Sequence, residues 1–360
     1  MAQPPLKTHD ALQKYFCKCI ENHSTLSFVG MERACGKTTV FKAFLEARRD
    51  RVYGVSSIGT DHLSSKPGAG DRGLVYVPAG SLVATARQAL SLCDATKEIL
   101  ATTGIPTPLG EIILFKTLSD GFVFLAGPSR IADVIRVKQS MLEAGAQNVF
   151  IDGAVDRKSS AVPALADGVI LSSKLFSADF DNPENKLSTQ IRLLQTKVME
   201  NPQPWMNVDD ENQESASWFL VDALGVSYYP KPGETPESMM SLIQRVPSSI
   251  RAIFFSGAVT HLSLRELITA DQESRSKLAG ATLLAEDTTK IFLDQKHLNK
   301  LEDLGLSLRV VRPIHLLGLG INPAEVAMEQ DKIPAWMNEC AAYFKLPVFD
   351  VVGGLFVEGI

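Results

Sequence analysis

Residues 30–39 read Gly30-Met31-Glu32-Arg33-Ala34-Cys35-Gly36-Lys37-Thr38-Thr39, and this stretch, here named the glycine loop, decides the fold. The residues before it, 25–29, form the apolar run of a short buried strand. Residues 37–48, which overlap the end of the loop, repeat apolar side chains at the spacing of one helix face. The sequence therefore predicts a strand, a loop bounded by two glycines and a helix in immediate succession.

The glycine loop has the residue types of a site for a phosphate chain. A loop that leads from a strand into a helix offers backbone N–H groups and the positive end of the helix dipole to an anion. Lys37 is expected to neutralise the β- and γ-phosphates of a nucleotide, and the hydroxyl of Thr38 to ligate Mg²⁺. The residues expected to contact nucleotide are Gly30, Glu32, Arg33, Cys35, Gly36, Lys37, Thr38 and Thr39. An ordinary glycine-rich turn is the alternative interpretation.

A carboxylate is expected near the metal, at the end of a buried strand. Residues 147–151 form an apolar run that is followed by Asp152 and Gly153. Ligands of open α/β sheets bind at the carboxyl ends of the strands, so Asp152 is predicted to share Mg²⁺ with Thr38 and to support hydrolysis. The competing interpretation is a plain aspartate before a glycine turn.

Five residues, Met31 to Cys35, separate the two glycines of the loop, where the common pattern has four. The longer spacing resembles the dethiobiotin-synthetase and cobyrinate-amidase branch of P-loop proteins. In that branch an acid after the second strand reaches Mg²⁺ or the γ-phosphate. The resemblance implies this metal-binding and catalytic role for Asp61, which follows the strand predicted at residues 52–58. A solvated loop acid is the alternative.

Composition excludes several classes of function. The chain has 360 residues, 45% of them hydrophobic, and a net charge of −5 without a basic run, which argues against nucleic acid and anionic membranes as partners. Its five cysteines and six histidines lack zinc-site spacing, so we expect reduced thiols, no zinc and a cytoplasmic location. Neither a signal peptide nor a transmembrane segment is expected.

The run Asn299-Lys300-Leu301-Glu302 ends in glutamate where a guanine box has aspartate, which favours ATP over GTP.

Alternating strand-like and helical segments predict an α/β protein with a parallel or mixed sheet, P-loop NTPase-like, that carries helices on both faces. We predict a nucleotide-binding domain at residues 1–200, a polar, proline-containing linker at 201–217 and a C-terminal α/β domain at 218–360. Residues 84–101 are predicted to form a helix. Residues 111–117 and 122–126 are predicted to form a hairpin about Ser119-Asp120-Gly121.

Several further segments resemble one family. Together with the glycine loop they are residues 56–59, 95–100, 102–111, 118–121, 125–129 and 151–159. In order and content they resemble the KamB-type reactivase subunits that serve the adenosylcobalamin-dependent lysine 5,6-aminomutase. The resemblance covers residues 25–200 well and the second half loosely. That family often has a Lys–Asn pair where this chain has Arg33 and Ala34.

The resemblance implies an ATP- and Mg²⁺-dependent helper protein that frees damaged cobalamin from an aminomutase so that intact cofactor can enter. Its expected partners are the aminomutase and a second reactivase subunit, and an oligomer is compatible with this role. Two other interpretations stay open. One is an ATP-dependent ligase of the dethiobiotin-synthetase type, and the other is a scaffold that binds nucleotide with scarcely any hydrolysis.

Overall fold

The structure is a computed structural model that describes residues 9–59, 74–153, 158–174, 179–182, 184–200, 216–231, 233–235, 239–323 and 330–359. The chain forms two compact units. The first comprises Met1–Ala178 and His315–Ile360, and the second comprises Asp179–Ile314. Each unit has its own sheet and its own hydrophobic core.

These boundaries differ from the predicted ones. Residues 315–360 return to the first unit because the strand at Leu316–Asn322 pairs in parallel with the strand at Gly168–Lys174. The predicted linker at 201–217 lies inside the second unit, and residues 201–215 of it are outside the described residues. The second unit is thus an insertion between two neighbouring strands of the first.

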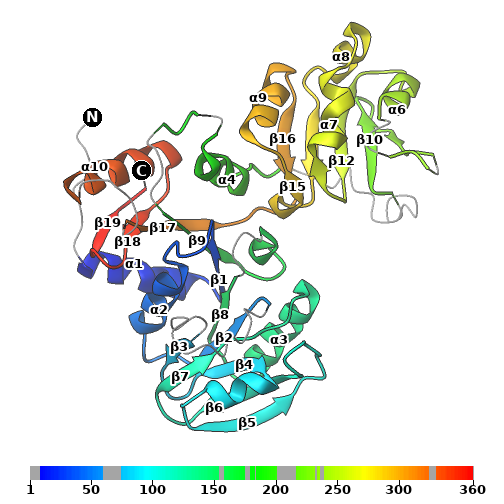
Figure 1. The fold of residues 1–360 in the computed structure, drawn as a ribbon. Coiled ribbons are helices and arrows are strands. Elements are labelled where there is room, and N and C mark those ends of the chain that lie inside the picture. Colours follow the sequence, from blue (N-terminus) through cyan, green and yellow to red (C-terminus); the bar gives the residue numbers. More distant parts are fainter. Residues whose placement is uncertain are drawn as a thin grey trace. The chain divides into compact units, whose positions relative to one another are not determined.

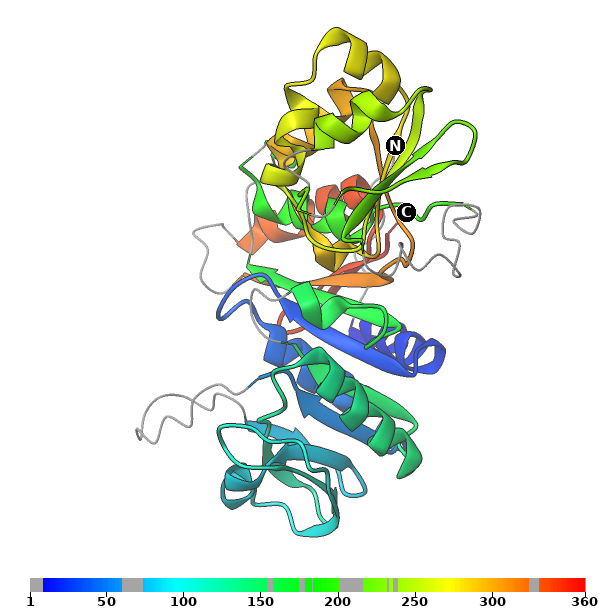
Figure 2. The same ribbon diagram turned by 90° about the vertical axis from the view of Figure 1, so that its right-hand side faces the viewer.

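The first unit is built on a mixed sheet, which confirms the predicted α/β class. Among the described residues its strands are β1 (Thr25–Gly30), β2 (Tyr53–Ser57), β4 (Leu82–Ala86), β5 (Lys97–Thr102), β6 (Ile112–Thr117), β8 (Asn148–Asp152), β9 (Gly168–Lys174), β17 (Leu316–Asn322), β18 (Val348–Asp350) and β19 (Leu355–Val357). Their order is β19-β18-β17-β9-β1-β8-β2-β4-β6-β5, which can be followed in Figures 1 and 2. The strands from β18 to β4 run parallel, and β19 and β6 join this set antiparallel at its two ends. The edge strand β5 pairs antiparallel with β6.

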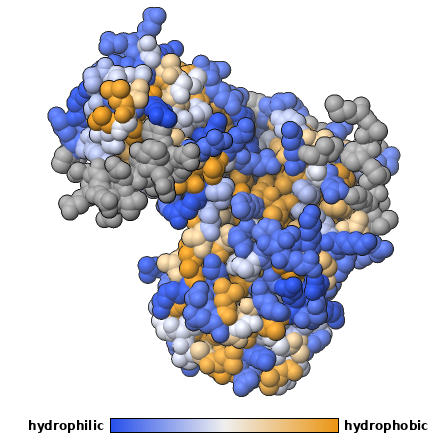
Figure 3. Space-filling model, turned by 180° about the vertical axis from the view of Figure 1, so that it is seen from behind, coloured by the Kyte–Doolittle hydropathy of each residue, from blue (hydrophilic) through white to orange (hydrophobic). Residues whose placement is uncertain are grey.

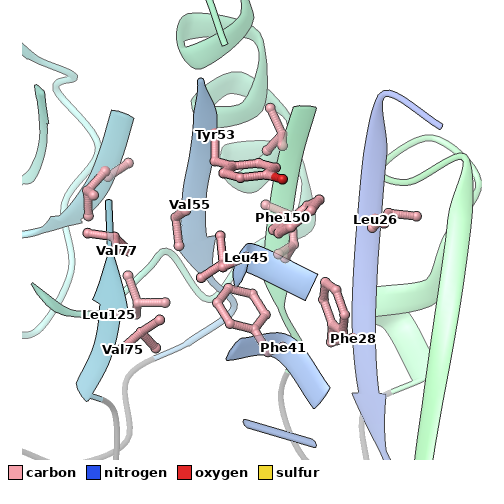
Figure 4. Close-up of a cluster of buried hydrophobic side chains, with 14 of the residues drawn as sticks. Leu26, Phe28, Phe41, Leu45, Tyr53, Val55, Val75, Val77, Leu125 and Phe150 are labelled. Atoms are coloured by element: carbon pink, nitrogen blue, oxygen red, sulfur yellow. The ribbon is translucent and has the colours of Figure 1, made fainter. Parts of the chain in front are cut away.

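Helices cover both faces of this sheet, as predicted. They are α1 (His9–Asn22), α2 (Lys37–Ala47), α3 (Ile131–Glu143) and α10 (Ile333–Phe344). Alternate residues of a strand point to opposite faces. Phe150 of β8 faces α2 (Figure 4). On the same face the rings of Phe28 in β1 and Phe41 in α2 pack edge to face, with their centroids 5.0 Å apart. Met141 of α3 lies over Gly54 and Val149, on the opposite face.

Two local predictions in the first unit are wrong. Residues 84–101 are not a helix, because they form the buried strand β4, a short 3-10 helix at Arg87–Leu92 and the edge strand β5. The strands predicted at 111–117 and 122–126 exist, but they are not partners in a hairpin. β6 pairs with β4 and β5, whereas β7 (Gly121–Phe124) pairs with β3 (Leu74–Val77).

The second unit is also α/β, as predicted for the C-terminal half. Its described strands form a sheet in the order β11-β10-β12-β14-β16, and β13 (Val259–Thr260) pairs separately with β15 (Ile291–Phe292). The sheet strands are β10 (Trp218–Asp222), β11 (Ser227–Tyr228), β12 (Ile250–Phe255), β14 (Thr282–Ala285) and β16 (Ser307–Val310). Its helices are α4 (Lys186–Leu194), α6 (Met239–Arg245), α7 (His261–Ile268), α8 (Gln272–Leu278) and α9 (Gln295–Asp303). None of the helices in the described part of the chain combines the length and apolar character needed to cross a membrane.

Candidate functional site

The glycine loop connects β1 to α2, as the sequence predicts. Met31 N–H donates to the carbonyl oxygen of Ser172 in β9 at 2.9 Å, which ties the start of the loop to the neighbouring strand. Gly36 has φ +85°, and Ala34 also lies in the left-handed region with φ +58°. Glycine adopts this region without a Cβ clash, so Gly36 suits the sharp turn into the helix. The loop is therefore a tight turn with a defined backbone.

The amino end of α2 is open to an anion. Gly36 occupies the N-cap position and has no side chain with which to cap the helix. The first N–H groups of an α-helix have no partner inside the helix, and the helix dipole places positive charge there. These groups of α2 are therefore suited to phosphate oxygens, which bind readily at helix amino ends.

Lys37 and Asp152 meet beside this helix end. Nζ of Lys37 lies 2.7 Å from Oδ1 of Asp152, and the two side chains are only 12% and 17% exposed. Nζ also donates to the carbonyl oxygen of Gly153. The pair forms because β8 is the parallel neighbour of β1, with Phe28 opposite Asp152, so both strands end at the same edge. The Lys37 ammonium, the Asp152 carboxylate and the uncapped amino end of α2 thus lie together.

The end of β8 is held by backbone hydrogen bonds on both sides. The carbonyl oxygen of Asp152 accepts from Ile58 N–H at 3.0 Å, and Gly153 N–H donates to the carbonyl oxygen of Phe28 at 2.9 Å. These bonds hold the backbone that carries the Asp152 carboxylate, and a binding site requires its charged groups to be held in place in this way.

Segments that carry the family resemblance converge on this edge. Ser57 lies opposite Asp152 at the end of β2, and its Oγ accepts from Gly127 N–H at 2.9 Å. Gly59 N–H donates to the carbonyl oxygen of Pro128 at 2.8 Å. A Cβ on Gly127 would lie 1.7 Å from the carbonyl oxygen of Ser57, so only glycine fits here. Residues 56–59, 125–129 and 151–153 are therefore joined to one another at this edge, and Asp152 and Gly153 link them to Lys37 of the glycine loop.

The other predicted site residues have mixed outcomes. Cys35 is buried, with its Sγ 2.8 Å from where a Cβ on Gly30 would lie, so only its backbone could face a ligand. Glu32 and Thr38 are half-buried, while Arg33 and Thr39 are exposed. Asp61 lies outside the described residues. Among the residues described, no three or more His, Cys, Asp or Glu side chains gather as metal ligands, so the Mg²⁺ set stays a prediction.

Asn322, at the end of β17, is a site residue that the sequence interpretation missed. Its Nδ2 donates to the carbonyl oxygen of Ala34 at 2.9 Å, and a Cβ on Gly36 would lie 3.1 Å from its Cβ. Asn322 is 288 residues from Ala34 along the chain and lay in the presumed second domain. The sequence does contain a hint of this role. An apolar strand ends at Asn322-Pro323, and Asp152 was predicted as a site residue because it also follows an apolar strand.

The second unit has a pocket of about 350 Å³ between α4, α9 and β16. Its lining combines leucines and polar side chains with the charged residues Arg192, Lys197, Glu302 and Arg309. Arg192 is paired with Glu302 and Arg309 donates to the carbonyl oxygen of Leu308, so the lining offers less free positive charge than its composition suggests. The glycine loop remains the stronger candidate for an anion site.

Comparison with known proteins adds no relative. No family model matches the chain, and neither a curated protein nor a solved structure matches it.

Proposed function

We propose that the chain binds a nucleoside triphosphate with Mg²⁺ at the glycine loop and hydrolyses it, with ATP preferred and GTP as the alternative. The observation that carries this proposal is the position of Lys37 and Asp152, 2.7 Å apart, beside the uncapped amino end of α2. A cation, a carboxylate and free helix amides are the groups that a P-loop uses on a phosphate chain.

The residues present fit a bound Mg²⁺–triphosphate. Mg²⁺ prefers oxygen ligands and commonly takes one or two from protein, with phosphate and water supplying the rest. The Thr38 hydroxyl and the Asp152 carboxylate offer such oxygens, directly or through water. Mg²⁺ would neutralise charge on the phosphate chain. Lys37 would exchange Asp152 for phosphate oxygens and so leave that carboxylate to the metal. The role proposed for Asp61, sensing the γ-phosphate, rests on the family resemblance alone.

We infer that nucleotide use serves the reactivation of a cobalamin-dependent aminomutase, together with a second reactivase subunit. The family resemblance supports this inference, as does the convergence of its segments on one sheet edge. Nucleotide binding can stabilise one conformation of a protein and hydrolysis can reset it. Work of this kind could drive release of a tightly held, damaged cofactor. The predicted cytoplasmic location belongs to the same proposal.

An exposed apolar surface also supports a protein partner. Ile99 and Leu100 of the edge strand β5 and Leu118 after β6 are exposed by 59%, 42% and 54%. The back view in Figure 3 shows apolar surface over this lower part of the first unit, among hydrophilic residues. Two of the resembling segments, 95–100 and 118–121, contain these residues. Exposed apolar side chains in these segments are available for a protein contact, which a reactivase requires.

The experiment is a reactivation assay. An aminomutase inactivated by turnover is mixed with this protein, the second subunit, Mg²⁺ and fresh adenosylcobalamin, with and without ATP. The proposal predicts recovery of activity only with ATP, and none with Lys37→Ala. Equal recovery without nucleotide, or no recovery with the cognate mutase, would contradict the reactivase function. Phosphate release that depends on a small carboxylate instead of the mutase would favour the ligase.

A further inference from the structure

We infer that Asn322 is a positioning residue that sets the conformation of the glycine loop, so that the C-terminal segment of the chain forms part of the nucleotide site. This inference rests on the proposed function and extends it to a strand, β17, to which the sequence assigned no role. It does not require Asn322 to touch the nucleotide.

Ala34 is the residue that needs support. Its φ of +58° lies in the left-handed region, where a Cβ is crowded and non-glycine residues are uncommon. The hydrogen bond from Asn322 Nδ2 to its carbonyl oxygen, at 2.9 Å, fixes the direction in which that peptide group points. Strained backbone of this kind persists where surrounding contacts determine it. Asn322 therefore offsets the unfavourable conformation of Ala34.

Asn322 is itself held by the sheet. It is the last residue of β17, opposite Lys174 of β9, and β9 is the direct neighbour of β1. The loop is thus held by two successive strands. β9 accepts from Met31 N–H through the carbonyl of Ser172, and β17 donates to Ala34 through its terminal side chain. The loop is therefore held at two points, Met31 and Ala34, by hydrogen bonds to neighbouring strands.

The contact extends to the start of the helix. A Cβ placed on Gly36 would lie 3.1 Å from the Asn322 Cβ, so the asparagine also packs against the N-cap of α2. A loop with its amides already oriented binds an anion more tightly, because less ordering remains to be done on binding. Loss of the Asn322 contact should therefore weaken nucleotide binding.

The test is titration calorimetry with Mg²⁺ and a non-hydrolysable ATP analogue. Asn322→Ala should weaken binding about 10-fold, the loss expected for one hydrogen bond that orders a site. Asn322→Asp should weaken it further, because a carboxylate cannot donate to the Ala34 carbonyl and repels phosphate. Ala34→Gly in the Asn322→Ala background should restore part of the affinity, since glycine adopts a positive φ without a Cβ penalty.

Asn148 provides a matched control. It is an asparagine of the same sheet, at the amino end of β8, and its Nδ2 donates to the carbonyl oxygens of Ile20 and His23, both at 2.8 Å. Asn148→Ala should lower Tm and leave the affinity of the folded protein unchanged. Asn322→Ala should show the reverse pattern, with a smaller change in Tm than Asn148→Ala and lower affinity.

The outcomes separate this inference from the proposed function. If the wild-type protein binds neither ATP nor GTP analogues, the proposed function fails and the role of Asn322 fails with it. If the wild-type protein binds nucleotide and both Asn322 variants bind it with the wild-type affinity, the inference is overturned while the proposed function stands. It is also overturned if Asn148→Ala reduces affinity as much as Asn322→Ala, or if Ala34→Gly restores nothing.

Discussion

The ammonium nitrogen of Lys37 lies 2.7 Å from Oδ1 of Asp152, joining the first residue of α2 to the last residue of β8. Both side chains are mostly shielded from water. In such a setting a charge is stabilised by its partner, and removal of either residue changes the surroundings of the other. The pair therefore defines the centre of the site.

Replacement of Lys37 by alanine should weaken binding of Mg²⁺ and an ATP analogue by about 10- to 100-fold, since a charge-assisted contact to phosphate is lost. Lys42→Ala is the control. Like Lys37→Ala, it removes one positive charge from α2, but Lys42 lies beyond the first turn of the helix. Calorimetry on both variants decides the matter. Equal losses would mean that charge on α2, and not the position of Lys37, governs binding.

Asp152→Asn should leave Tm within a few degrees of the wild-type value and reduce hydrolysis at least ~10-fold, which corresponds to about 1.4 kcal/mol of transition-state stabilisation. The control is Asp167→Asn. Asp167 accepts hydrogen bonds from Ser24 N, Ser24 Oγ and Thr25 N at the opposite end of β1. That change should lower Tm without slowing hydrolysis in the folded protein. A collapse of folding in Asp152→Asn, with normal hydrolysis by the fraction that folds, would show a structural role.

Gly36→Ala should destabilise the protein by about 1–2 kcal/mol through its left-handed backbone, and should also weaken nucleotide binding. Gly145, which follows α3, has φ +101° and open space where a Cβ would be, whereas a Cβ on Gly36 would meet Asn322. Gly145→Ala should therefore lower the stability of the fold through its positive φ alone and leave the affinity for nucleotide unchanged. Urea unfolding and calorimetry measure the two effects, and retained affinity in Gly36→Ala would count against the loop geometry.

Local features of the site could be predicted from the sequence. The strand, the loop and the amphipathic helix around Lys37 are set by short-range spacing and end close to the predicted positions. The position of Asp152 followed from one general property of α/β sheets, that ligands bind where parallel strands end. Its direct contact with Lys37 could not be predicted, because the sequence does not state which strands are neighbours.

Features set by long-range pairing were missed. Residues 84–101 have helical spacing, yet β4 is buried between β2 and β6, and sheet pairing overrides such weak local preferences. β17 returns to β9 after the whole second unit, so neither the domain boundary nor the contact of Asn322 with Ala34 is visible in local pattern. Nothing in the spacing of an apolar strand identifies its partner.

Asp222 gives a prediction for the second unit. Its burial alone would raise the pKa of the carboxyl, but hydrogen bonds from Val226 N, Ser248 Oγ, Leu224 N and Tyr228 Oη outweigh burial, and the net pKa is lowered. A lowered folded pKa contributes stability that is present above the unfolded value of about 3.9 and is lost as pH falls below it. Thermal unfolding from pH 7 to pH 3 should show Asp222→Asn destabilised at pH 7 and less sensitive to acid than wild type. Parallel curves for the two proteins would refute this role.

The most direct test of the central claim is titration of the wild-type protein with non-hydrolysable analogues of ATP and GTP in the presence of Mg²⁺. The structure places an uncapped helix end, Lys37 and Asp152 at one sheet edge, and the account predicts saturable binding of one nucleotide per chain that depends on Mg²⁺. Absence of binding of either analogue at millimolar concentration would contradict it.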